Sequence, residues 1–314
     1  MALVPMRRSR NAKPLRGRRG VLLGAAIGVG VSVLGSCSGA ETPSANTLAQ
    51  PVPTPVERVS RLDAIRANKS ITIGVKEDVP LFGLLDPKSG MLSGFDIEIA
   101  KGIAKRLLPG ENPGTRVRFV EALSKNREAM LQDGAADLVI STYTITDARK
   151  QLVDFAGPYY IAGQDVLTLR ELIDNGTIRG IDDVNGRKVC SVNGSTSLLN
   201  LQSAAPRADI SITRDKYSEC FEELRRGRVD AMTTDDVILL GLALQDKRFG
   251  LTGNPFRTEP YGIGVPKGDT ELRAFVNDAL DDMIRTGEWA EAFRSTVGTA
   301  GVLVPAPPAI DRYP

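Results

Sequence analysis

Strand-like and helix-like segments alternate along this chain from residue 71 to residue 245. Residues 71–75 place apolar side chains at every second position, as in a strand, and residues 99–107 repeat them on one helical face. Such alternation is typical of α/β lobes built on mostly parallel sheets. Further strands are predicted at 115–120, 137–141, 165–169, 188–192, 210–214 and 231–234, and further helices at 126–133, 197–203, 217–226 and 237–245.

The composition is ordinary for a globular protein except in one respect. The chain has 314 residues, of which 42% are hydrophobic and 25% charged, and it contains no histidine. The length suggests about two domains. The lack of histidine excludes Ser-His-Asp and Cys-His catalysis and every metal site with a histidine ligand. We predict no catalytic residue, no metal site and no cofactor.

The N-terminal segment has the pattern of a bacterial lipoprotein signal peptide. Basic residues between Arg7 and Arg19 precede the apolar residues 21–34, a stretch too short to span a bilayer comfortably. Leu-Gly-Ser then leads directly to Cys37 and resembles a lipobox. We predict a signal peptide at 1–36 and lipidation of Cys37. A plain signal peptide with a chance cysteine is the alternative.

Removal of the predicted signal peptide changes the charge of the chain. It takes away seven basic residues and no acidic ones, leaving 33 basic against 38 acidic residues and a net charge of −5. No basic patch interleaved with aromatic residues remains, so we expect no nucleic-acid partner. Residues 37–59 are rich in Ser, Thr, Pro and Ala and predict a disordered tether, and residues 298–314 predict an irregular tail.

Hydroxyl residues and one arginine follow the predicted strand at 137–141. The segment 141–160 reads STYTITDARKQLVDFAGPYY, with Thr142 and Thr144 at the strand tip and Arg149 shortly after. Arginine matches a carboxylate bidentately, and hydroxyl and backbone N–H groups add donors. The segment therefore indicates a carboxylate site, although a lone motif of this kind also fits a surface loop.

This segment resembles the signature of the polar-amino-acid solute-binding proteins of bacterial ABC importers. The resemblance extends over residues 70–293, through the blocks at 71–87, 93–107, 227–241 and 260–269. It implies a periplasmic-binding-protein fold of the second type, in which two lobes are joined by a hinge that the chain crosses twice. Lobe one is then expected at 60–162 plus 260–297 and lobe two at 163–259, with crossings near 160–164 and 258–261.

The resemblance also implies the groups that hold an amino acid. Arg149 with Thr142 and Thr144 matches the clamp for the α-carboxylate, and Asp235 matches the acceptor of the ammonium group. Asp235 precedes a predicted helix, so capping of that helix is the alternative. Ser195 and Thr196 open another helix whose N–H groups suit a carboxylate, and they too fit simple caps.

Selectivity is expected to depend on Lys76 and Arg127. Both are at positions that face the cleft in the resembling family, and buried cations require an anionic partner. The alternative is that each is a solvated surface charge. An acidic amino acid supplies the anion better than an amide does. Tyr143 and Tyr261 are expected either as walls of the site or as ordinary core residues.

Two cysteines fall in the expected second lobe, Cys190 in a predicted strand and Cys220 in a predicted helix. An exported chain with two thiols in one lobe favours a disulfide. Two buried, reduced cysteines are the alternative.

These observations predict a monomeric, lipid-anchored protein on the extracytoplasmic face of the membrane. It would capture glutamate or aspartate, with asparagine and glutamine as further candidates, for an ABC permease. The alternative is a sensor that reports amino-acid availability to a membrane receptor. An enzyme of the dehydratase type is a third class, disfavoured because no histidine serves as acid or base.

Overall fold

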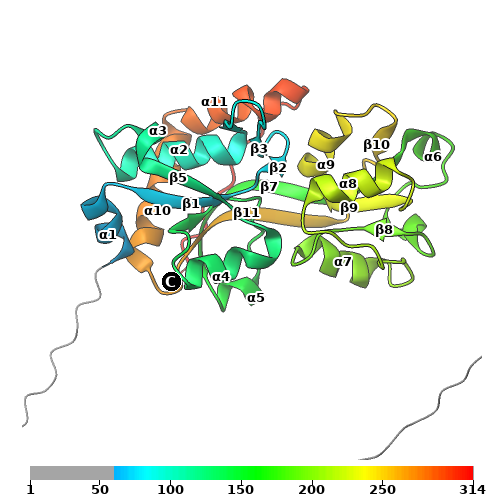
Figure 1. The fold of residues 1–314 in the computed structure, drawn as a ribbon, viewed down its shortest axis with the longest axis horizontal. Helices are drawn as coiled ribbons and strands as arrows, with labels where there is room; N and C mark the ends of the chain where they lie inside the picture. The colour runs from blue at the N-terminus through cyan, green and yellow to red at the C-terminus, as the bar shows by residue number, and fades with distance from the viewer. Residues whose placement is uncertain (1–59, 314) are drawn as a thin grey trace, which may run out of the picture. The chain divides into compact units, whose positions relative to one another are not determined.

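The computed structural model describes residues 60–313, which contain a mixed eight-stranded sheet and a three-stranded antiparallel sheet (Figure 1). The predicted signal peptide, Cys37 and tether lie outside the described residues. The strands are β1 (Ile71–Val75), β2 (Asp78–Val79), β3 (Gly83–Leu85), β4 (Leu92–Ser93), β5 (Val117–Glu121), β6 (Leu138–Val139), β7 (Asp154–Leu169), β8 (Val189–Cys190), β9 (Ala231–Asp235), β10 (Phe249–Leu251) and β11 (Arg257–Val265).

Helices cover the larger sheet and confirm the predicted α/β class. The α-helices are α1 (Arg61–Asn68), α2 (Phe95–Leu107), α3 (Pro113–Arg116), α4 (Arg127–Gln132), α5 (Asp147–Lys150), α6 (Arg170–Asp174), α7 (Thr196–Ala204), α8 (Tyr217–Arg225), α9 (Asp236–Ala243), α10 (Thr270–Arg285) and α11 (Glu288–Ser295). Short 3₁₀ helices lie at Ser124–Asn126, Ile181–Val184 and Val297–Ala300.

The large sheet has parallel pairs near its two edges and antiparallel pairs in its middle. Its strand order is β5-β1-β6-β11-β7-β9-β8, and β10 pairs with β7 outside this path. The pairs β1–β5, β1–β6 and β8–β9 are parallel. The long strands β7 and β11 pair antiparallel with each other and with their other neighbours.

The strands β7 and β11 run side by side between the two groups of elements in Figure 1. The first part of β7 pairs only with β11, and its last residues pair with β9 and β10. In this ladder Gly163 lies opposite Thr258 and Tyr160 lies opposite Tyr261. The two predicted crossings are therefore hydrogen-bonded neighbours. The lobe boundaries themselves stay a prediction.

The predicted strand at 210–214 is wrong. The segment has only two isolated parallel bridges, from Asp209 to Lys188 and from Arg214 to Val192, to residues on either side of β8. Between them the Ser211 N–H donates to the Asp209 carboxylate at 2.9 Å. This local bond competes with the strand ladder for the backbone, so the apolar alternation does not give a strand here.

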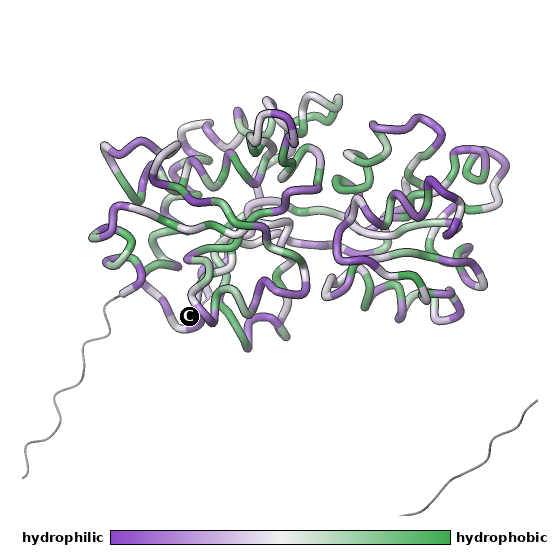
Figure 2. Tube along the Cα trace, viewed as in Figure 1, coloured by the Kyte–Doolittle hydropathy of each residue, from purple (hydrophilic) through white to green (hydrophobic). Residues whose placement is uncertain are grey.

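An aromatic cluster joins α2, α11 and the strands β7 and β11 in the core. Phe95 lies at its centre, fully buried, with ring centroids 5.5–6.1 Å from five neighbouring rings. Gly94 precedes it with φ at 126°, and a Cβ there would lie 2.3 Å from the Phe82 backbone. Only glycine fits this approach, which fixes the start of α2. Many of the outer loops are hydrophilic, as Figure 2 shows.

The C-terminal residues 302–313 contain no helix or strand, yet they are fastened to the core. The Asp311 N–H donates to the Gly157 carbonyl at 2.8 Å, and the Phe155 N–H donates to the Tyr313 hydroxyl at 2.7 Å. The Tyr313 ring also lies under the Lys150 ammonium, 4.2 Å from its centroid. The tail is therefore irregular but ordered along β7 and α5.

Candidate functional site

The predicted site residues come from strand ends and from the turns that follow them. Lys76 follows β1, Thr142 and Thr144 follow β6, and Asp235 ends β9. The carboxyl ends of parallel strands meet at one edge of a sheet, which is where ligands bind in open α/β sheets. Each of these four side chains is buried, with exposed fractions of 1–4%.

Arg149 is held on the short helix α5, whose N-cap Thr146 accepts the Arg149 N–H at 3.2 Å. Its guanidinium donates to the Thr144 carbonyl at 2.8 Å, to the Gly194 carbonyl at 3.1 Å and to Glu128 at 3.1 Å. Burial and the charge of Arg127 lower the pKa of Arg149. The guanidinium therefore bridges the turn after β6 and the loop before α7.

The hydroxyl residues around Arg149 have different roles. The Thr196 hydroxyl donates to Glu259 at 2.8 Å and lies 3.4 Å from the Thr144 hydroxyl. The Ser195 hydroxyl accepts the Leu198 N–H at 3.1 Å and thus caps α7. Ser195 therefore serves as a helix cap, whereas Thr196 lies next to Thr144, whose carbonyl accepts from Arg149.

Thr142 adopts a left-handed backbone, with φ at 44°, which is strained for a β-branched residue. Its N–H donates to the Asp96 carboxylate at 2.8 Å, and the Tyr159 hydroxyl donates to the other Asp96 oxygen at 2.6 Å. Burial raises the pKa of Asp96 to about 7, against the opposing effect of these hydrogen bonds. Asp96 therefore holds Thr142 in place. Sequence reasoning missed Asp96, and the only sign of it was an acidic residue among the apolar residues of α2.

Asp235 is buried and has no cationic partner among the described residues. It accepts from the Tyr261 hydroxyl at 2.6 Å and from the Ser197 hydroxyl at 3.4 Å. Its side chain makes no capping bond to α9, so the capping alternative does not hold. Burial, followed by the charge of Glu259, raises the pKa of Asp235 to about 8. An ammonium group would supply the missing charge.

The two predicted tyrosines lie in different surroundings. Tyr261 is fully buried on β11 and orients Asp235 through its hydroxyl. Tyr143 is equally buried but packs on Phe155, with ring centroids 4.8 Å apart. The guanidinium carbons of Arg127 and Arg149 lie 4.3 Å and 5.0 Å from the Tyr143 ring centroid. Tyr143 is therefore a core residue that supports both arginines.

Lys76 is a buried cation without a carboxylate partner among the described residues. Its ammonium donates to the Ser124 hydroxyl at 3.0 Å, and only 1% of the residue is exposed. Burial, followed by the charge of Arg127, lowers the pKa of Lys76 to about 7. The alternative of a solvated surface charge does not hold for Lys76.

Arg127 is also buried, with 2% of the residue exposed, but it faces the backbone. It donates to the carbonyls of Ser124 at 3.3 Å, Ser141 at 3.0 Å and Thr142 at 3.2 Å. These bonds hold the turn after β6 in place. A contact of Arg127 with the ligand stays a prediction. The positive charge of Arg127 lowers the pKa of Lys76.

Sequence reasoning missed Tyr217, the first residue of α8. Only 3% of Tyr217 is exposed, and its ring centroid lies 5.5 Å from the Lys76 ammonium. Ser124, which accepts from Lys76, was missed as well. No motif marked either residue, because both are far from Lys76 in the sequence; even Ser124 is 48 residues away.

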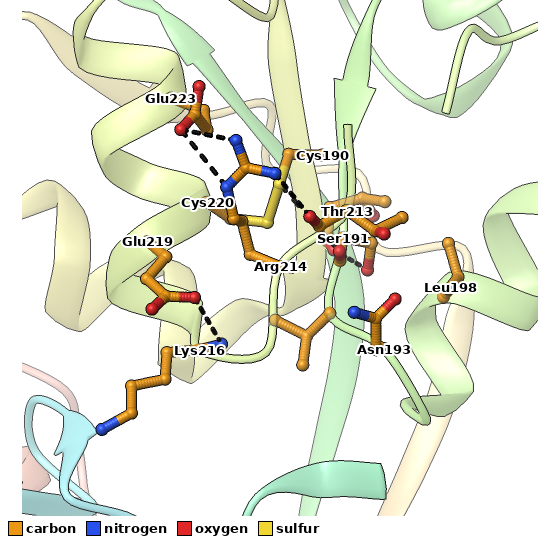
Figure 3. Close-up of a disulfide and its surroundings, with 12 residues drawn as sticks. Cys190, Ser191, Asn193, Leu198, Thr213, Arg214, Lys216, Glu219, Cys220 and Glu223 are labelled. Carbon is orange, nitrogen blue, oxygen red and sulfur yellow. Dashed lines mark hydrogen bonds and ion pairs between the residues drawn. A yellow bond between two sulfur atoms is a disulfide. The ribbon is translucent and has the colours of Figure 1, made fainter. Parts of the chain in front are cut away.

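The predicted disulfide joins Cys190 in β8 to Cys220 in α8, with a Cα–Cα distance of 5.6 Å (Figure 3). Arg214 and Glu223 lie beside it and form an ion pair at 2.8 Å. The disulfide ties α8 to the sheet three residues after Tyr217.

Residues 60–313 contain no group of three or more His, Cys, Asp or Glu residues arranged to hold a metal ion. No helix in the same range has the length and apolar character of a membrane span.

Residues 71–299 match the family described as bacterial extracellular solute-binding proteins, family 3. The chain is 42% identical to the ABC transporter glutamine-binding protein GlnH of Bacillus subtilis over 75% of this chain and 84% of that protein. It is 36% identical to the glutamate-binding protein GluB of Corynebacterium efficiens over 74% of this chain and 80% of that protein.

A solved structure has the same fold. The crystal structure of the solute receptor for L-cysteine of Neisseria gonorrhoeae superimposes with a TM-score of 0.71 and 29% sequence identity. The superposition covers 77% of this chain and 95% of that one.

Proposed function

The chain belongs to family 3 of the bacterial extracellular solute-binding proteins, and we propose that it captures a polar, acidic amino acid for an ABC importer. The family and the relatives named above are solute-binding proteins, so this chain is a solute-binding protein and not an enzyme. Relatives named for glutamine and glutamate support an amino acid as the ligand.

One observation carries the proposal: a buried lysine lacks a carboxylate, and a buried aspartate lacks a cation, among the described residues. Lys76 and Asp235 are 1% and 2% exposed, and their hydrogen bonds go to hydroxyl groups. Buried charges are costly unless they are paired. An amino acid with a carboxylate side chain offers an anion to Lys76 and an ammonium to Asp235.

The α-carboxylate of the ligand is proposed to lie against Arg149. The Thr144 carbonyl accepts from this guanidinium, and the Thr144 hydroxyl lies beside Thr196. Thr196 begins α7, whose N-terminal N–H groups favour an anion. Together, Arg149, Asp235 and Lys76 distinguish the three charged groups of glutamate or aspartate. Glutamine and asparagine would satisfy Arg149 and Asp235 but leave Lys76 without a charged partner.

A calorimetric screen of all twenty amino acids against the purified protein tests the proposed ligand class. We expect glutamate or aspartate to bind with the lowest Kd, and asparagine or glutamine to bind at least tenfold more weakly. Equal or tighter binding of an amide would contradict the acidic preference, and binding of none of the twenty would contradict the proposed function.

We further propose that lipidation of Cys37 anchors the protein to the extracytoplasmic face of the membrane, where an ABC permease receives the ligand. The pattern before Cys37 supports this step. Cys37→Ala is expected to release the protein from membranes or to block its processing. Unchanged membrane association and migration of this variant would refute the anchor.

A further inference from the structure

Tyr217 is a buried residue that lies beside the cationic side chain of Lys76. Its ring covers Lys76, whose ammonium lies 5.5 Å from the ring centroid. Burial raises the pKa of Tyr217, the charge of Asp235 adds to this rise, and Arg127 and the hydroxyls of Thr234 and Ser124 oppose it. Tyr217 therefore adjoins groups from β1, the turn after β5, and β9.

Three polar contacts bracket Tyr217, and each reaches a segment near β1 or β5. Asp215 pairs with Lys125, and Lys216 pairs with Glu121. The Ser218 N–H and hydroxyl both donate to Asp78, at 3.0 Å and 3.2 Å. We call residues Asp215, Lys216, Tyr217 and Ser218 the clasp.

The charges of the clasp specify one alignment. Asp215 is opposite a lysine and Lys216 is opposite a glutamate. A shift by one residue would bring Asp215 toward Glu121, and like charges repel. The backbone also approaches closely here, because a Cβ on Gly194 would lie 2.5 Å from the Lys125 Cα.

Residues just after the clasp hold it to α8 and to strand β8. Glu219 accepts the N–H groups of Asp215 and Lys216, both at 3.3 Å, and the disulfide holds Cys220 to β8. Figure 3 shows Lys216 extending away from this disulfide, with its backbone bonded to Glu219. Glu219 and the disulfide therefore hold the start of α8, from which Tyr217 extends toward Lys76.

We infer that Tyr217 determines which amino-acid side chain the protein binds. The clasp holds Tyr217 against Lys76. The inference rests on the proposed function and deepens it. Because the Lys76 ammonium lies 5.5 Å from the Tyr217 ring centroid, a ligand group that pairs with this ammonium would lie near the ring. The ring therefore limits the length of the ligand side chain, and its hydroxyl is a hydrogen-bonding group for the end of that chain.

The test measures Kd by calorimetry for aspartate, glutamate, asparagine and glutamine with wild-type protein, Tyr217→Leu and Tyr217→Phe. Tyr217→Leu should change the ratio of Kd values between the four-carbon and five-carbon acids at least tenfold. Tyr217→Phe keeps the ring and should change the ratio between acid and amide at least threefold. Phe221→Leu alters a buried ring of the same helix outside the site and should leave both ratios unchanged.

The clasp is tested with charge reversals. Lys125→Asp and Asp215→Lys should each weaken every ligand at least threefold, and the double reversal should restore Kd to within about twofold. Lys101→Glu, which alters an exposed pair on α2, is the control and should change nothing.

The outcomes separate the inference from the proposed function. If wild-type protein binds none of the amino acids, both fail. If it binds but Tyr217→Leu and Tyr217→Phe keep the wild-type ratios within twofold, only the selecting role of Tyr217 is overturned. If Tyr217→Leu does not fold, Tyr217→Phe decides. A double reversal no better than its single variants overturns the clasp.

Discussion

Raising the pH from 6 to 8 should weaken glutamate binding relative to glutamine binding about tenfold. The pKa of Lys76 is about 7 because burial and the charge of Arg127 outweigh the opposing carboxylates. About nine-tenths of Lys76 is then protonated at pH 6 and about one-tenth at pH 8. The charged and titratable groups around it are Arg127, Tyr217, Asp78, Glu121 and Asp96.

The sign of this effect follows from proton linkage. A ligand carboxylate that pairs with Lys76 raises the lysine pKa, so glutamate binding above pH 7 takes up a proton and loses affinity as the pH rises. A tenfold change in the ratio corresponds to about 1.4 kcal/mol. Glutamine lacks the carboxylate and does not require the protonated lysine. The raised pKa of Asp235 affects both ligands through the same ammonium group, so it cancels in the ratio.

Isothermal titration calorimetry of both ligands at pH 6, 7 and 8 measures this ratio. Two buffers with different ionisation enthalpies report the proton taken up. Lys76→Met is the control, and its ratio should not depend on pH. A wild-type ratio that stays within twofold from pH 6 to pH 8 would refute the pairing of Lys76 with the ligand side chain.

Three other variants or treatments are informative. Arg149→Ala should weaken every amino acid at least a hundredfold in the same assay, since charged hydrogen bonds contribute about 1.5–3 kcal/mol each; a loss of tenfold or less would contradict the clamp. At pH 6, where Lys76 is already mostly protonated, Arg127→Gln should weaken acids and amides alike, because the arginine holds backbone carbonyls; a selective loss of acids at this pH would show that Arg127 contacts the ligand. Reduction of Cys190–Cys220 should lower the free energy of unfolding by about 2–4 kcal/mol in urea titrations. Thiol labelling of both cysteines in the unreduced protein would show that the disulfide does not form.

Local patterns predicted the secondary structure where a segment's own residues determine it. The first strand was predicted with the bounds that β1 has, and α8 was predicted to within one residue at its end. Residues 210–214 do not form the predicted strand, because the Ser211 N–H donates to the Asp209 side chain and not to a neighbouring strand. The strand predicted at 165–169 is the end of the longer β7. Pairing with β11 extends this strand toward its N-terminus, to Asp154.

The site was less accessible from sequence because its chemistry depends on contacts between distant segments. Ser195 and Thr196 are adjacent in sequence, yet Ser195 caps α7 and Thr196 lies beside Thr144 and Glu259. Tyr217 has no motif, and only its approach to Lys76 gives it a role. Residue type predicts which chemistry is possible, whereas partners decide which of two roles a side chain has.

The ladder between β7 and β11 determines how the two parts of the large sheet can move. Two hydrogen-bonded strands act mechanically as a ribbon. Bending the ribbon within its own plane would lengthen one strand against the other and break ladder bonds, whereas twist requires only small backbone rotations. The register shift between Tyr261 and Ile263 is the point where such rotation is easiest, because a bulge leaves the ladder locally unpaired. Tyr261 adjoins this shift, so twisting of the ribbon here would move the hydroxyl group that donates to Asp235.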